Sequence, residues 1–120
     1  MAIIFEWKDA AMEEGVKQET MRRTGRILAQ GKDIQIIRYD KEPGGVTPEH
    51  SHPEELIGIL IKGKQEAILN GERVSIAAGM GYYIPANENH GPFTNVGDET
   101  CVTLDIVTPP RVMKADKPEK

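Results

Sequence analysis

The sequence predicts an all-β fold, a sandwich or barrel built from short strands. Apolar stretches of strand length recur along the chain, and clusters of glycine, proline and asparagine separate them. The pair Asn70-Gly71 lies between two such stretches, which is the strongest short sequence signal for a β-hairpin. No segment has a convincing amphipathic helical period, and Gly15 interrupts the charged stretch before residue 22.

The stretch 56–61, LIGILI, is apolar on both of its predicted faces. We therefore expect a strand that is buried on both sides, in the middle of a sandwich or at a dimer interface. The stretch 101–107 alternates, so that Asp105 shares a face with Cys101 and lies opposite Leu104. The full set of expected strands is 27–29, 34–39, 56–61, 65–69, 73–76, 82–84, 92–95 and 101–107.

The length of 120 residues is enough for one hydrophobic core and leaves no room for a second. We expect a single domain over 1–120, with an N-terminal arm at 1–25, the barrel at 26–111 and a flexible tail at 112–120. The apolar segment 3–7 in the arm is expected to form a short strand or a strap across the body.

Composition excludes several classes of partner. A net charge of −4 argues against nucleic acid, because phosphate binding needs a basic patch. No apolar run approaches the ~20 residues of a transmembrane helix, so no membrane partner is expected. The N-terminus lacks the pattern of a signal peptide, and the single Cys101 cannot form an internal disulfide; a cytoplasmic location is expected by default.

The three histidines of the chain, His50, His52 and His90, occur in two glycine-bounded stretches, 44–63 and 79–95. His50 and His52 are two residues apart, so on an extended strand they point to the same face. Neutral imidazole is a good ligand for Zn, Fe, Mn or Ni, and His90 is the one remaining histidine that can complete the set. A surface or core role for each histidine is the alternative.

Together the two stretches resemble the motifs of the cupin superfamily, whose members are jelly-roll barrels of two sheets. Gly44, His50, His52 and Gly63 match the first motif, and Gly79, Pro85 and His90 match the second. Asn87 stands where the second motif has a further glycine, and asparagine tolerates a positive φ well. Asn95 lies one residue later than the asparagine that ends the second motif. The resemblance implies a double-stranded β-helix fold and a metal held by the histidines.

Leu56 departs from that pattern, because cupins usually have a glutamate or glutamine ligand at this place. Glu54 and Glu55 come just before it, and we expect Glu55 to be the better candidate for a fourth ligand and Glu54 to face solvent. Three histidines without a carboxylate also make a sound metal site, since they leave positions open for water or substrate.

The run 104–111, LDIVTPPR, resembles that of small single-domain cupins typified by the uronate ketonases of pectin and alginate degradation. The resemblance places Asp105 and Arg111 beside the metal pocket as candidate catalytic residues. Val107 replaces an aromatic residue of that pattern. Alternatively, Asp105 is a structural carboxylate paired with Arg38, Arg73 or Arg111, and Arg111 is a solvated charge.

Three functions are compatible with these residues. The first is a metal-dependent isomerase, lyase or tautomerase acting on a small polar acid or sugar, such as an unsaturated uronate. The second is a non-haem iron dioxygenase, although its usual ligand set includes a carboxylate. The third is a non-enzymatic cupin that binds a small ligand. The apolar segments 3–7 and 56–61, and the resemblance, also predict a homodimer.

Overall fold

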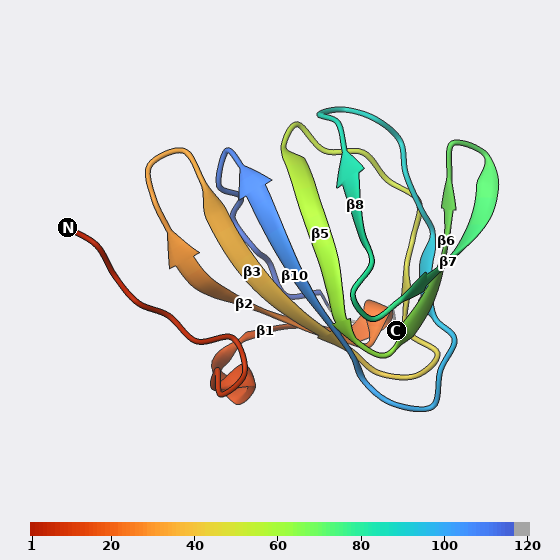
Figure 1. Cartoon of the computed structure of the whole chain (residues 1–120), viewed down its shortest axis with the longest axis horizontal. Helices are drawn as coiled ribbons and strands as arrows, with labels where there is room; N and C mark the ends of the chain where they lie inside the picture. The colour runs from red at the N-terminus through yellow and green to blue at the C-terminus, as the bar shows by residue number, and fades with distance from the viewer. Residues whose placement is uncertain (117–120) are drawn as a thin grey trace.

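The computed structural model describes residues 1–116, which form two antiparallel β-sheets facing each other (Figure 1). Two short 3-10 helices, Met12–Glu14 and Glu19–Met21, flank the first strand. The strands are β1 Val16–Gln18, β2 Arg23–Gln30, β3 Gln35–Lys41, β4 Val46–Thr47, β5 Glu55–Lys62, β6 Lys64–Leu69, β7 Glu72–Ala77, β8 Gly81–Ile84, β9 Phe93–Asn95 and β10 Cys101–Thr108. No helix in this part of the chain is long and apolar enough to cross a membrane.

The larger sheet has the strand order β1-β2-β3-β10-β5-β8 and the smaller one the order β4-β9-β6-β7. Neighbours in the sheets come from distant parts of the chain, which is the arrangement of a jelly roll. The predicted hairpin is confirmed: β6 pairs with β7, and Asn70 and Gly71 both have positive φ, 53° and 77°. Asn87 also has a positive φ, 64°, as its glycine-like place predicts.

The core lies between the two sheets in two clusters of side chains. One is centred on Ile37, Leu56 and Val107 of the larger sheet, and the other joins Leu60 to Phe93 of the smaller sheet. Strand β5 contributes to both clusters, because its alternate residues point inward: Leu56 belongs to the first and Leu60 to the second. Its outward residues Ile57 and Ile59 remain 49% and 38% exposed, so burial of this strand on both sides is not observed within one chain.

Both ends of the chain are more ordered than the sequence predicts. The larger sheet begins at Val16, inside the predicted arm, and Arg38 donates to the carbonyl of Trp7, whereas the expected short strand over 3–7 does not form. In the predicted tail, Met113 packs against the core and Asp116 forms a parallel bridge with Gln18. Residues 117–120 of that tail lie outside the described residues.

Candidate metal centre and adjoining pocket

The structure brings the three histidines together, as the sequence predicts. One ring nitrogen of each lies within 4.8 Å of those of the other two. His50 and His90 pair through their backbones, with N···O distances of 3.0 and 2.9 Å in the two directions. This bridge joins the loop after β4 to the loop after β8, so the two motifs meet at one end of the barrel.

Each histidine is oriented by a backbone carbonyl. The Nδ1 atoms of His50, His52 and His90 lie 2.7, 2.7 and 2.8 Å from the carbonyl oxygens of Pro48, Glu54 and Glu88. Since a carbonyl can only accept, Nδ1 carries the proton and Nε2 has the free lone pair.

The same three rings fit a metal ion on chemical grounds. The Nε2 atom of His52 is buried and has no hydrogen-bond partner in the described chain. Burial lowers the pKa of His50 and His52, so both imidazoles are neutral at neutral pH, the form that binds metal. An orphaned lone pair beside two similarly oriented imidazoles is what a divalent cation would satisfy.

Glu55, the predicted carboxylate ligand, is not brought to the histidines. It begins β5 on the outward face, and its side chain accepts a hydrogen bond from the hydroxyl of Tyr83 at 3.2 Å. Glu54, expected to face solvent, turns inward instead, with its side chain only 14% exposed. Side chains of an extended strand point alternately to its two faces. Because Leu56 is buried in the core, Glu55 points outward and Glu54 points inward, the reverse of the prediction.

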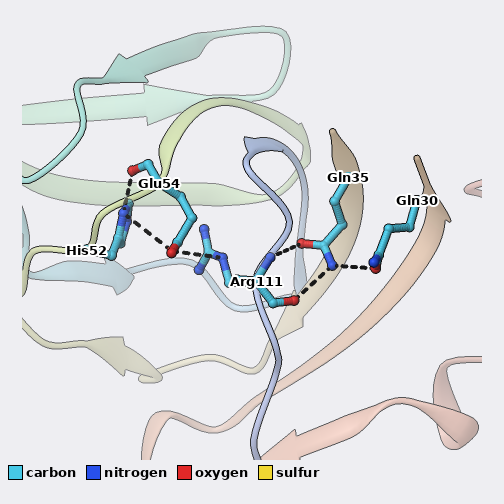
Figure 2. A network of polar contacts seen from close by, with 5 residues as sticks. All are labelled: Gln30, Gln35, His52, Glu54 and Arg111. Atoms are coloured by element: carbon cyan, nitrogen blue, oxygen red, sulfur yellow. Dashed lines mark hydrogen bonds and ion pairs between the residues drawn. The ribbon is translucent and has the colours of Figure 1, made fainter. Parts of the chain in front are cut away.

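Glu54 connects the metal centre to Arg111 (Figure 2). Its Oε1 lies 3.9 Å from Nδ1 of His52 and 3.8 Å from Nε of Arg111. Arg111, predicted from the sequence as a site residue or a solvated charge, is therefore part of the pocket, with its side chain 18% exposed.

Asp105 points into the barrel, on the same face of β10 as Cys101. Burial raises the pKa of its carboxyl, while nearby Arg111 and Arg23 act in the opposite direction. Its Oδ1 atom is buried without a hydrogen-bond partner, and no described arginine or lysine forms an ion pair with it. Arg38, Arg73 and Arg111 pair with Asp40, Glu66 and Glu54 instead, so none of the three structural pairings considered for Asp105 forms.

All three histidines line an inner cavity of about 50 Å³, and His50 and His52 also border an outer pocket of about 580 Å³. His50, His52, Arg23, Thr47 and Arg111 border both spaces, and Asp105 and Lys41 lie on the inner one. The inner cavity has room for an ion and a few water molecules. A larger ligand must therefore occupy the outer pocket and reach the histidines past the residues that border both spaces. We call this boundary the neck.

Sequence reasoning did not find Arg23, Lys41 or Gln65. Lys41 is 5% exposed and donates to Oε1 of Gln65 at 3.0 Å and to the carbonyl of Phe93 at 3.1 Å. Burial lowers its pKa to about 7. The available sequence signal was their place on strands β2, β3 and β6, and strand alternation alone does not show which of the two faces of a strand lines a cavity.

Comparisons with known proteins agree with this geometry. The model of the family described as "Cupin domain" matches residues 38–107. The H2HPP isomerase of Bacillus subtilis is 33% identical over 72 residues, which are 60% of this chain and 30% of that protein; the chain thus spans less than a third of this relative.

Among solved structures, KdgF from Halomonas sp. superposes with a TM-score of 0.77 at 20% identity, covering 92% of this chain and 96% of the other. The polyketide cyclase RemF from Streptomyces resistomycificus gives a TM-score of 0.70 at 21% identity, covering 95% and 89%. At these identities the two structures support the jelly-roll fold alone.

Proposed function

We propose that this chain, which belongs to the cupin-domain family, is a metal-dependent enzyme of the isomerase, lyase or tautomerase type. Its substrate is a small polar acid or sugar, such as an unsaturated uronate. The observation that carries the proposal is the juxtaposition of three histidines, each with Nε2 left free, and the unpartnered carboxyl of Asp105 in one cavity. The H2HPP isomerase relative supports isomerase-type chemistry.

The residues would divide the work as follows. His50, His52 and His90 would hold a divalent Mn, Fe, Zn or Ni ion. When bound, such an ion supplies a Lewis acid that polarises a carbonyl or hydroxyl oxygen of the substrate. Arg111 would hold the substrate carboxylate through its two enclosed N–H groups, and Glu54 would keep the guanidinium beside His52.

Asp105 would move the proton. Its buried Oδ1 takes a proton from one substrate atom and returns it to another, so that the isomerisation is balanced and needs no oxidant. The raised pKa of this carboxyl suits the role, because a base that is too acidic holds a proton poorly.

The proposal is tested by metal content and turnover together. Untagged protein is analysed for metals beside the His50→Ala/His52→Ala variant, and near-stoichiometric metal in the wild type alone is expected. Turnover of an unsaturated monouronate is then followed by loss of the ultraviolet absorbance of its conjugated double bond. Asp105→Asn should keep the metal and lose about 10²–10⁴-fold in turnover, whereas Asp98→Asn, on an exposed loop, should match the wild type.

Other results would contradict it. No metal after incubation with Mn, Fe, Ni and Zn, or ligand binding without turnover, would favour the small-ligand binder. Oxygen consumption that depends on Fe(II) would favour the dioxygenase.

We also propose that the chain forms a homodimer through the outer face of the larger sheet. Ile57, Ile59 and Tyr83 lie on adjacent strands β5 and β8 and are all exposed there. The N-terminal segment, red in Figure 1, extends away from the sheets and exposes Ile3 and Ile4. Neighbouring exposed apolar side chains such as those on β5 and β8 are typical of protein interfaces, and a second copy would cover them.

A further inference from the structure

We propose that Arg23 joins Arg111 in a two-arginine subsite for a carboxylate, placed at the neck between the inner cavity and the outer pocket. The ligand would carry this carboxylate apart from the group that faces the three histidines. The role of Arg111 in this subsite rests on the proposed function. The role of Arg23, and the binding of one carboxylate by both arginines, go beyond it.

Arg23 is held in a fixed orientation. It begins β2, and its Nε donates to Oε1 of Gln18 at 2.6 Å. The guanidinium carbon lies 4.1 Å from the centre of the Tyr39 ring, a cation–π contact that fixes the plane of the group. The side chain thus has a defined place on the wall of both spaces before any ligand binds.

Arg23 makes no direct ion pair with a described acidic side chain, although Asp105 is near enough to act against the lowering of its pKa by burial. None of the ion pairs formed within residues 1–116 includes Arg23, and its remaining contact is Thr47, with Nη1 3.5 Å from Oγ1. Burial lowers the pKa of its guanidinium. An enclosed cation without a counter-ion is costly, and a bound anion would offset that cost.

Arg111 lies close enough to act with it. Both arginines border the same two spaces, and after burial the nearby positive charge of Arg111 is a further cause that lowers the pKa of Arg23. The Nε and Nη2 atoms of Arg111 are enclosed and unpartnered within the described chain, because Glu54 at 3.8 Å is beyond hydrogen-bonding distance. Two guanidinium groups therefore have N–H donors left for a planar, bidentate acceptor.

The overall charge of the pocket also favours an anionic ligand. The chain has a net charge of −4, yet the charged residues on the two spaces are mainly basic. Asp105 and Glu54 are the described acidic side chains there, opposed by Arg23, Arg111, Lys41 and Lys114. A divalent ion on the histidines would add to this positive charge, which makes an anionic ligand the natural complement.

The test uses malonate as the probe and metal-free protein, so that binding through a metal is removed from the measurement. Untagged wild type is dialysed against a chelator and titrated in a calorimeter with malonate, with neutral malonamide and with inorganic phosphate. Malonate is expected to bind, malonamide to show no binding, and phosphate to bind more weakly. Arg23→Gln should lower the malonate affinity at least tenfold. Arg22 is the exposed neighbouring arginine, and Arg22→Gln should leave the malonate affinity unchanged.

Arg23→Lys serves if Arg23→Gln does not fold, since it keeps the charge and loses the planar fork. Its malonate affinity should fall several-fold. Unchanged malonate affinity in both variants, equal binding of malonamide, or tighter binding of phosphate would each overturn the subsite. The measurement involves neither metal nor turnover, so its failure is distinct from a failure of the proposed enzyme activity.

Discussion

The side-chain amide of Gln35 bonds both backbone polar groups of Arg111. Its Nε2 donates to the Arg111 carbonyl at 3.0 Å, and its Oε1 accepts from the Arg111 N–H at 3.1 Å (Figure 2). Gln35 is 1% exposed and is itself held by Gln30, whose Oε1 lies 2.9 Å from the same Nε2. A residue of β3 thus fixes the backbone from which the Arg111 guanidinium reaches the pocket.

We therefore expect Gln35→Leu to affect both stability and ligand binding. The change leaves the N–H and carbonyl of Arg111 without partners, which should cost about 1–3 kcal/mol in the free energy of unfolding. Malonate affinity should fall as well, because Arg111 loses its fixed position. Urea unfolding and calorimetry measure the two effects.

Gln30→Ala is the matched control for Gln35. It removes the exposed partner and leaves both bonds to Arg111, so the free energy of unfolding should change by less than about 0.5 kcal/mol. A Gln35→Leu protein that is destabilised yet binds malonate as the wild type does would show that Gln35 supports the fold without positioning Arg111.

Lys41 predicts a specific pH dependence of stability. Burial lowers its pKa from 10.5 to about 7 in the folded state, so between these values the unfolded chain binds one proton more. The free energy of unfolding therefore rises with pH across this window, by at most about 1.4 kcal/mol per pH unit. Below pH 7 both the folded and the unfolded chain carry this proton, so the destabilisation caused by Lys41 is complete and no longer changes with pH.

Urea unfolding between about pH 7 and pH 8.5 should reveal this slope. The upper limit keeps Cys101 out of the measurement, because burial raises its pKa above 9.0 and makes stability fall at higher pH. Lys41→Met should flatten the slope, and Lys62→Met, at an exposed position of β5, should retain it. Equal slopes in the wild type and Lys41→Met would refute the assignment.

The sequence was sufficient to predict the all-β fold, the hairpin at Asn70-Gly71 and the convergence of the three histidines. These features depend on local signals: a turn that needs positive φ, the alternation of side chains, and glycine-bounded motifs. The choice between Glu54 and Glu55 failed because it depends on the phase of β5. That phase is set by the burial of Leu56 and Leu60 in the two clusters of the core.

The remaining pocket residues have no local signal. Arg23 lies on β2, and Lys41 and Gln35 lie on β3. They enter the site because β2 pairs with β3 and β3 pairs with the distant strand β10. An arginine or lysine on a strand is usually solvent-exposed. Only the tertiary pairing reveals which of them line the cavity.

Gly58 is a further position whose role is set by a distant residue. A Cβ atom at this place in β5 would lie 2.6 Å from Cε1 and Cζ of Tyr82. We expect Gly58→Ala to reduce the free energy of unfolding by about 1–3 kcal/mol, because it forces the Tyr82 ring toward the cavity. Gly31→Ala is the control: its Cβ would have 3.5 Å to the nearest atom, and its stability should be unchanged or slightly greater. A Gly58→Ala variant as stable as the wild type would show that the ring can move at no cost.

The dimer proposal is tested by placing a charge on each sheet in turn. Ile57→Glu introduces a carboxylate on the outer face of the larger sheet, where a second copy would bury it at a cost of several kcal/mol. Ile68 is similarly exposed, at 40%, but lies on β6 of the smaller sheet. Sedimentation should therefore find a dimer for the wild type and for Ile68→Glu, and a monomer for Ile57→Glu. A monomeric wild type at micromolar concentration would remove the proposal, and a dimer that Ile68→Glu disrupts would move the interface to the smaller sheet.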